Sequence, residues 1–306
     1  MVTAAGEPLA LLFPGQGAHD VKMLDGVRGL PGFARRYEAV ADALGSSPLD
    51  ELAAGHADYL NQNRVTALLT LLVSSLSLDL FHEQTGGKAD FVSGYSVGQW
   101  TALYAAGALS FDELVAVVAA RSALMDECFA DIPGAMLAVI GVKAEVLENL
   151  CDGLRAKSYR VWVSNYNCVG QYTIAGAADA IEAAERAVAD LKPRKVARVP
   201  VSGAWHTPLL AAAHAGFATH LADVTLAPTT VPVVDNVTGG WLPTARAALD
   251  LQLARHLDHP VLWEQGIRAL LAKGAKRFVE IGYGNVLTKF GFFIDRSVEH
   301  QAFYVS

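Results

Sequence analysis

The sequence predicts an α/β protein with a largely parallel sheet, and its alternating pattern carries that prediction. An apolar run at residues 9–13 is typical of a buried strand, and a second such run follows at 91–93. Helical segments at 33–44 and 65–81 lie between the two runs, and an amphipathic helix is expected at 111–129. Strands that alternate with helices in this way indicate a parallel sheet covered by helices.

The totals indicate a folded chain of one large domain or two modest ones. Of its 306 residues 52% are hydrophobic and 18% charged, so it can bury a sizeable core. The net charge of −7 gives no reason to expect a nucleic-acid partner. The stretch 66–81 is too short to span a bilayer, so no membrane partner is expected. Three scattered cysteines favour a cytoplasmic protein without metal or disulfides: Cys128, Cys151 and Cys168.

A second type of pattern begins after residue 131. Short strands and two helices are expected in the order β-α-β-β-α-β, at 136–140, 144–154, 160–164, 172–175, 178–191 and 196–199. This order is typical of a ferredoxin-like unit. We therefore expect a small ferredoxin-like domain over 131–199, inserted into a large α/β domain made of 1–130 and 200–306. The Pro/Gly-rich stretch 228–243 is expected to be a loop around one short strand.

The most informative motif is the pentapeptide Gly94-Tyr95-Ser96-Val97-Gly98. It joins the strand at 91–93 to a helical segment, so it predicts a serine on a sharp strand–turn–helix elbow, as in an α/β-hydrolase-like domain. The two glycines let strand and helix approach the turn closely. The Val97 N–H lies at the helix N-terminus, where it can stabilise an oxyanion. Ser96 is therefore a candidate nucleophile, and a plain Gly-rich turn is the alternative.

A serine nucleophile needs a base, and His206 is the candidate. It ends a loop just before Thr207 and Pro208, which favour the start of a helix. The positive end of a helix dipole disfavours imidazolium, which keeps a neutral base available. The alternative is a loop histidine that is hydrogen-bonded locally.

Arg121 is an unusual residue for its position. It lies seven residues after Leu114, inside the apolar stripe of the helix at 111–129. A buried guanidinium is unfavourable unless it meets an anion. Two interpretations remain open: an internal Asp or Glu partner, which the residues alone favour, and a bidentate site for a substrate carboxylate.

Gly15-Gln16-Gly17 follows the first strand, so a dinucleotide-binding loop must be considered. The G-x-G-x-x-G pattern fails because residue 20 is Asp. The glycines are instead expected to let the Gln16 backbone N–H approach an oxyanion.

Taken together, these segments resemble the malonyl-CoA:acyl-carrier-protein transacylase family, which includes the acyltransferase domains of polyketide synthases. The resemblance runs from about residue 11 to 290. Its motifs occur in the family's order: Phe13-Pro14-Gly15-Gln16-Gly17, the elbow with Gln99, Arg121-Ser122-Ala123-Leu124-Met125, 165–176, 201–209, Asn236-Val237-Thr238, 260–263 and 280–287.

The resemblance implies a ping-pong transfer that uses a coenzyme A thioester as substrate and no bound cofactor. His206 would take the proton of Ser96, and the serine would attack the thioester. The backbone N–H groups of Gln16 and Val97 would hold the oxyanion. The backbone carbonyl of His256 would orient the base. The phosphopantetheine thiol of an acyl carrier protein would then accept the acyl group.

The resemblance also implies the acyl specificity. Arg121 would bind an acyl carboxylate. Trp205 occupies a position where malonyl-selective members often have Phe, so it should crowd an α-methyl group and favour malonyl. The larger ring could also reshape the pocket for another acyl unit, although malonyl is the leading choice. Tyr95, which replaces the usual His before the serine, would line the same pocket.

Other departures from the family pattern favour a divergent branch, in polyketide or other secondary metabolism, over the housekeeping fatty-acid enzyme. They are Gln99 for Glu, Val169 for Pro, Tyr283 for Pro, His256 for Gln or Asn, and the lack of a Gln that is usual in the helix near Val65. The elbow with Tyr before Ser is also similar to that of the transacylase subunit of malonate decarboxylase.

Two other functions remain as alternatives. An acyl hydrolase that clears stalled acyl groups would need the same Ser and His, but the retained Arg121 argues against it. A non-catalytic docking module for carrier proteins is disfavoured because Ser96, His206 and Arg121 are all present. Carrier proteins are typically acidic, and the densest basic cluster could bind one or be a solvated charge run: Lys192, Arg194, Lys195 and Arg198.

Overall fold

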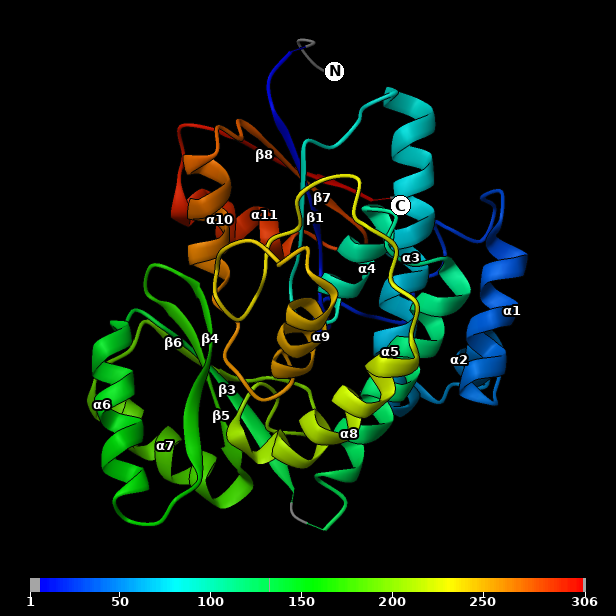
Figure 1. Ribbon diagram of the computed structural model, residues 1–306. Helices are drawn as coiled ribbons and strands as arrows, with labels where there is room; N and C mark the ends of the chain where they lie inside the picture. Colours follow the sequence, from blue (N-terminus) through cyan, green and yellow to red (C-terminus); the bar gives the residue numbers. More distant parts are fainter. Residues whose placement is uncertain (1–5, 132, 305–306) are drawn as a thin grey trace.

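The computed structural model describes residues 6–131 and 133–304, which form two sheets with helices around them (Figure 1). The first sheet is parallel, with strand order β2-β1-β7-β8, and the second is antiparallel, with order β4-β5-β3-β6. The strands are β1 Leu9–Phe13, β2 Phe91–Gly94, β3 Gly134–Ile140, β4 Val161–Cys168, β5 Gln171–Ala177, β6 Lys195–Arg198, β7 Arg277–Ile281 and β8 Glu299–Phe303. Both strands predicted for the parallel sheet are confirmed, and β7 and β8 were not predicted.

The predicted helices are confirmed with ends that differ by a few residues, and four further helices, at 48–53, 246–255, 263–272 and 286–294, were not predicted. The helices are α1 Phe33–Leu44, α2 Pro48–Ala53, α3 Asn63–Thr85, α4 Gly98–Ala105, α5 Phe111–Glu127, α6 Ala144–Arg155, α7 Ala178–Asp190, α8 Ala211–Asp223, α9 Arg246–Arg255, α10 Trp263–Ala272 and α11 Val286–Ile294. Two 3₁₀ turns cover Ala57–Asn61 and Pro208–Leu210.

The strand β1 lies inside the parallel sheet and is buried along its whole length. Leu9, Leu11 and Phe13 face a core formed with α3, α4 and α5. The alternate residues Ala10 and Leu12 face a core formed with α10 and α11. Because side chains alternate between the two faces of a strand, a strand covered on both faces is apolar throughout. Figure 1 shows these two groups of helices on opposite sides of the sheet.

The helix α3 is the one described helix that is long and apolar enough to cross a membrane by length and composition. However, 83% of its most apolar stretch is buried inside the protein. It packs against α1, α4 and α5. The helix is therefore a core helix, as its sequence predicts.

The antiparallel sheet follows the predicted order β3-α6-β4-β5-α7-β6. Its own apolar core lies between the strands and the two helices α6 and α7. This lobe stands beside the parallel sheet (Figure 1). Its strand β4 contacts α10 and α11 of the large lobe. The small sheet therefore packs against the lobe that contains the parallel sheet and residues 94–98.

The stretch 228–243 does not contain the predicted short strand. Its described residues form only isolated bridges, between Val92 and Val233 and between Val234 and Trp241. Pro228, Pro232 and Pro243 interrupt the stretch. Because proline has no N–H to donate, a regular ladder cannot continue through it.

Candidate active site

The elbow forms where β2 ends at Gly94 and α4 begins at Gly98. Ser96, between them, has a φ of 52°, a left-handed conformation that non-glycine residues rarely adopt. A Cβ on Gly94 would lie 1.9 Å from the Gly98 carbonyl oxygen, and one on Gly98 would lie 2.2 Å from that of Phe13. The predicted close approach is therefore confirmed, and both positions require glycine.

Asn236 holds this strained turn from the other side. Its Oδ1 accepts a hydrogen bond from the Ser96 backbone N–H (2.8 Å), and its Nδ2 donates to the Gly94 carbonyl (2.7 Å). Its own backbone N–H donates to Oε1 of Gln99 (2.8 Å). Asn236 was not among the predicted site residues. The only signal for it was its place in the Asn236-Val237-Thr238 motif.

Ser96 and His206, 110 residues apart, meet in the structure. The Ser96 Oγ lies 2.7 Å from His206 Nε2, and His206 Nδ1 lies 2.9 Å from the carbonyl oxygen of His256. A carbonyl oxygen only accepts, so Nδ1 carries the proton of the neutral ring. The Nε2 lone pair consequently faces the Ser96 hydroxyl, which is the arrangement that a general base requires.

The imidazole of His206 is held in its neutral form. The residue is 2% exposed. Burial lowers its pKa to about 3, and the positive charge of Arg121 is the second cause. The expected helix start after it is a 3₁₀ turn with Pro208 at its first position. The Thr207 hydroxyl does not cap this turn, because it donates to the Ala204 carbonyl (2.8 Å).

The loop that carries Gln16 lies against the elbow. A Cβ on Gly15 would be 2.6 Å from the Tyr95 carbonyl oxygen. The Gln16 amide is anchored on α3, where its Nε2 lies 3.0 Å from Asn63 Oδ1 and 2.7 Å from Thr66 Oγ1. The backbone of Gln16 is thus fixed beside Ser96, and Val97 lies across the turn at the N-terminus of α4.

Arg121 is fully buried on α5, yet none of its three guanidinium nitrogens has a hydrogen-bond partner within 6–131 and 133–304. Burial lowers its pKa to about 10, with Asp126 acting in the opposite direction. The Asp126 carboxylate accepts instead from Asn63 Nδ2 (3.0 Å). Within the described residues, the internal ion pair that the residues alone favoured is therefore not formed.

A small cavity of about 70 Å³ opens beside Ser96 and His206. Both lobes line it, with Gln16, Tyr95, Trp205 and Val201 from the large lobe and Met136, Asn165, Thr173 and Val199 from the segment 133–199. Arg121 does not line the cavity itself, although its charge acts on His206.

Trp205 forms a wall of the dyad cavity. The same residue lines a second cavity of about 420 Å³ on the side of Asn63 and Arg64. Its ring packs edge-on against Phe129, with the ring centroids 5.3 Å apart. The indole thus limits the room beside the dyad, and a smaller side chain would connect the two spaces.

Tyr95 also lines the dyad cavity, but its hydroxyl bonds elsewhere. The hydroxyl donates to Asn167 Oδ1 on β4 (2.6 Å), and the ring packs against Trp263 and Phe290. Burial raises the pKa of the Tyr95 hydroxyl. Tyr95 therefore ties the elbow to the small sheet.

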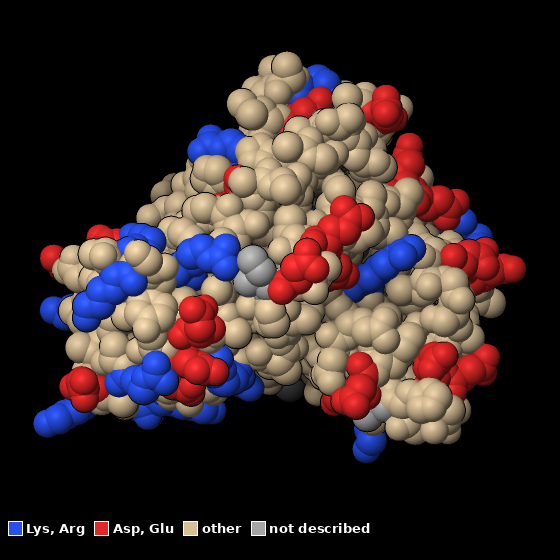
Figure 2. All heavy atoms as spheres, turned by 90° about the horizontal axis from the view of Figure 1, so that it is seen from below, with Lys and Arg blue, Asp and Glu red and all other residues tan. Residues whose placement is uncertain are grey.

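The basic cluster lies at the end of α7 and along β6, an edge strand of the small sheet. Lys192, Arg194, Lys195 and Arg198 are all exposed. Arg198 is paired with Glu185, its Nη2 lying 2.6 Å from the carboxylate. Figure 2 shows that most Lys and Arg side chains of the lower face gather on the small lobe, with acidic side chains among them.

The described part of the chain contains no group of three or more His, Cys, Asp or Glu that could hold a metal ion. Cys128, Cys151 and Cys168 are free thiols.

Known proteins share this architecture. Residues 35–292 match the family model described as the acyl transferase domain. The chain is 32% identical over 283 residues to the malonyl CoA-acyl carrier protein transacylase of Bacillus subtilis, which covers 92% of this chain and 88% of the relative. It is 34% identical over 281 residues to the same enzyme of Escherichia coli, which covers 91% and 90%.

Solved structures agree with these relatives. The malonyl-CoA:acyl carrier protein transacylase of Xanthomonas oryzae superposes with a TM-score of 0.91 at 30% identity, over 99% of this chain and 96% of that one. A malonyl-transacylase solved in complex with a type II polyketide acyl-carrier protein gives a TM-score of 0.89 at 28% identity, over 97% and 95%. The fold is thus that of an acyltransferase. The chain belongs to the malonyl-CoA:acyl-carrier-protein transacylase family.

Proposed function

We propose that this chain transfers a malonyl group from coenzyme A, through an ester on Ser96, to the phosphopantetheine thiol of an acyl carrier protein. The observation that carries the proposal is the pairing of a Ser–His dyad with a buried, unpartnered Arg121. The names of the Bacillus subtilis and Escherichia coli relatives support the same substrates.

The geometry accounts for the first half of the reaction. Nε2 of His206 takes the Ser96 proton as Oγ bonds to the thioester carbon. The N–H groups of Gln16 and Val97 receive the carbonyl oxygen as it becomes an oxyanion. When the tetrahedral intermediate collapses, the C–S bond breaks, and His206 returns the proton to the leaving thiolate. The carrier thiol then repeats these steps in reverse order.

Arg121 supplies the selectivity for a carboxylate. Its five N–H donors are buried without acceptors, and a carboxylate presents two oxygens that accept in a bidentate manner. An acetyl group would leave these donors unpaired. Trp205 restricts the volume near the α-carbon, so an unbranched acyl group fits best.

The carrier protein would dock on the cluster of Lys192, Arg194, Lys195 and Arg198, beside the segment that lines the cavity with Val199. The complex of the related malonyl-transacylase with a polyketide carrier supports this class of partner. A polyketide biosynthesis protein of Bacillus subtilis is 32% identical over 92% of this chain, which spans 36% of that protein. We therefore propose a role in polyketide or other secondary metabolism, in the cytoplasm.

We also propose the division into domains. A large α/β-hydrolase-like domain would comprise 1–130 and 200–306, and a small ferredoxin-like domain 131–199. Separate apolar cores support the boundary. The order β4-β5-β3-β6 of the small sheet supports its ferredoxin-like description.

Intact-mass measurement after mixing the protein with malonyl-CoA tests the function. We expect a stable malonyl adduct that maps to Ser96 and disappears when a holo carrier protein is added. Rapid release of free coenzyme A without a carrier would show the hydrolase instead. An absence of both adduct and turnover with malonyl-, methylmalonyl- and acetyl-CoA would show a docking module.

A charge reversal tests the docking surface. Lys195→Glu should raise the KM for the carrier protein several-fold and leave acylation by malonyl-CoA unchanged. Lys273→Glu, on the exposed end of α10, is the matched control. Equal KM values for both variants would exclude this cluster as the docking site.

A further inference from the structure

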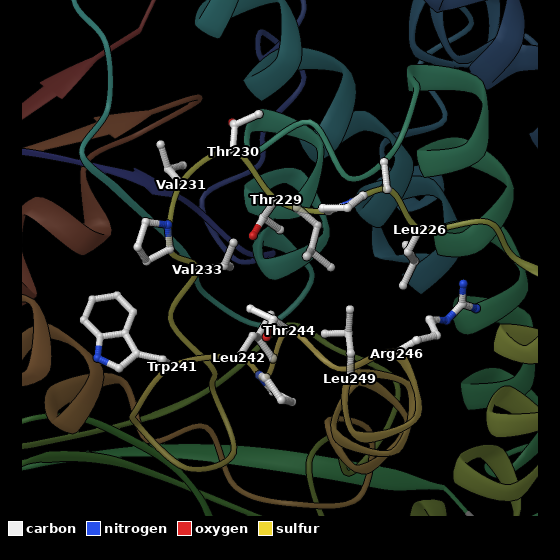
Figure 3. A pocket seen from close by; sticks show the side chains of 15 residues that line it. Leu226, Thr229, Thr230, Val231, Val233, Trp241, Leu242, Thr244, Arg246 and Leu249 are labelled. Carbon is white, nitrogen blue, oxygen red and sulfur yellow. The ribbon is translucent and has the colours of Figure 1, made fainter.

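A larger cavity of about 480 Å³ lies away from the dyad, between the segment 226–233 and the start of α9 (Figure 3). Small-molecule sites typically have volumes of roughly 300–1,000 Å³. None of the residues that line this cavity also lines the cavity of Ser96. It has no part in the proposed transfer, so its presence needs another explanation.

The lining of this distal cavity specifies an apolar, uncharged occupant. Figure 3 shows Thr229, Val233 and Leu249 directed into the space. Aliphatic side chains and prolines form most of the remaining wall, together with Trp241, two threonines and Arg246, and the lining contains no acidic residue.

The one charged residue in the lining, Arg246, is already engaged. Its Nε donates to the carboxylate of Asp250 (2.7 Å), and its Nη2 donates to the carbonyls of Leu221 and Val224 (2.8 and 2.6 Å). Two of its three guanidinium nitrogens are thus bound within the protein, and the uncharged polar side-chain groups of the lining are the threonine hydroxyls and the Trp241 indole N–H.

One wall of the cavity is continuous with the support of Ser96. Val233, Trp241 and Leu242 line the cavity. They pair across a short turn, in which the Leu242 N–H donates to the Val233 carbonyl (2.9 Å). This turn carries Asn236, whose Oδ1 holds the Ser96 N–H.

A second wall is continuous with the support of His206. Arg246 and Leu249 belong to α9, which ends at Arg255. The next residue, His256, caps the helix and accepts the hydrogen bond from His206 Nδ1. The two walls are joined by a bond from Gln252 Nε2 to Asp235 Oδ2 (2.7 Å).

We propose that the distal cavity binds one uncharged, apolar small molecule, and that the bound molecule speeds the acylation of Ser96. Dispersion contacts are weak individually but add up over the many atoms packed against a side chain. An occupant would supply those contacts and hold the turn of Asn236 and the end of α9 in their paired positions. The second half of this inference rests on the proposed roles of Ser96 and His206.

Titration with N-phenyl-1-naphthylamine, an uncharged fluorophore that brightens in apolar sites, tests the binding. Thr229→Trp fills the cavity from a residue that belongs to neither support. Thr225→Trp, exposed just before the segment 226–233 and outside the lining, is the matched control. We expect one saturable site and a rise in Tm with the wild type and the control, and at least tenfold weaker binding to Thr229→Trp. If that variant does not fold, Thr244→Trp fills the space from its rim.

The rate at which a fluorophosphonate labels Ser96 tests the coupling. Saturating fluorophore should raise the rate at least twofold in the wild type and in Thr225→Trp, and leave it unchanged in Thr229→Trp. A lack of saturable binding, or equal binding to the filled variant, would overturn the site. An unchanged or lower labelling rate would overturn the coupling. Neither measurement uses a thioester, so failure of malonyl transfer would be recognised separately.

Discussion

The two halves of the candidate site differ in how completely their polar groups are paired. Around Ser96 and His206, the serine hydroxyl, its N–H and both ring nitrogens all have partners at 2.7–2.9 Å. Around Arg121, three guanidinium nitrogens are buried without a partner in the described structure, and so are the two ring nitrogens of His256. Buried polar groups are usually satisfied, so the second half is the exception.

Under the proposed function, this difference separates the groups that carry out the chemistry from the group that recognises the acyl carboxylate. A dyad that must transfer a proton benefits from being assembled before substrate arrives, because no reorganisation is then needed in the transition state. A carboxylate site can remain incomplete, because the substrate supplies the missing acceptors. The unfavourable free energy of the unpaired Arg121 is then relieved only by an acyl group that carries an anion.

The largest expected effect comes from removing the nucleophile. Ser96→Ala should lower the transfer rate by at least about 10³-fold, because no acyl-enzyme can form. Steady-state transfer and intact mass measure this loss. Ser202→Ala, an exposed serine nearby, should keep nearly full activity. A variant that lacks Ser96 but is still malonylated at the wild-type rate would disprove the assignment.

The second-largest effect is expected at Arg121, in the part of the site whose buried polar groups have no partners among the described residues. Arg121→Met should lower kcat/KM for malonyl-CoA on the order of 10²-fold and change that for acetyl-CoA little. The same change should stabilise the fold by about 1–3 kcal/mol, because it removes buried donors that have no acceptors. Arg186→Met, exposed on α7, is the control in both assays. Equal losses of kcat/KM with malonyl-CoA and acetyl-CoA, together with a lower Tm, would show that Arg121 is a structural residue.

A smaller effect is expected at the support of the elbow. Asn236→Ala removes the acceptor for the Ser96 N–H and the donor to Gly94, so the strained turn can relax. A shift of about 1 Å at a nucleophile can lower a rate on the order of 10²-fold, so we expect a 10–100-fold loss in kcat with KM nearly constant. Asn149→Ala, exposed on α6, is the control. A change in KM alone would contradict this role.

The smallest effect concerns pH. With a pKa of about 3 for the buried His206, against an ordinary value of 6.5, the base stays neutral in mild acid. The kcat/KM for acylation should therefore stay constant from pH 7 to about pH 5. Because the charge of Arg121 helps to lower this pKa, Arg121→Met should move the acidic fall in rate toward higher pH. An unchanged pH profile in that variant would show that the two groups are not coupled.

The same shift predicts how stability responds to acid. Between pH 6.5 and 3 the unfolded chain binds a proton on His206 that the folded chain does not. This residue therefore makes the folded state less stable as pH falls through that window. Urea titrations of the wild type and of His206→Gln at several pH values measure how much His206 contributes to the pH dependence of the free energy of unfolding. An equal acid dependence in both proteins would contradict the prediction.

Local pattern was sufficient for the elements and motifs that depend on near neighbours. The apolar run of β1, the order β3-α6-β4-β5-α7-β6 and the glycines at 94 and 98 follow from side-chain period and from backbone freedom. The strands β7 and β8 were not predicted, because Arg277–Ile281 has two charged residues among its three apolar ones and Glu299–Phe303 has only two apolar residues. They form strands because each pairs in parallel with a neighbouring strand, β7 with β1 and β8 with β7.

The sequence by itself determined that a serine would sit on an elbow, that His206 and Arg121 were unusual for their positions, and which family the motifs resemble. Only the tertiary structure decided that Asn236 holds Ser96, that Tyr95 reaches β4, and that Arg121 meets no acid. The reason is physical: the first two facts are contacts between segments 140 and 72 residues apart, and in the third the carboxylate of Asp126 accepts from Asn63 of another helix. Neighbouring residues fix propensity and periodicity, but whether a buried group finds a partner depends on what the fold brings beside it.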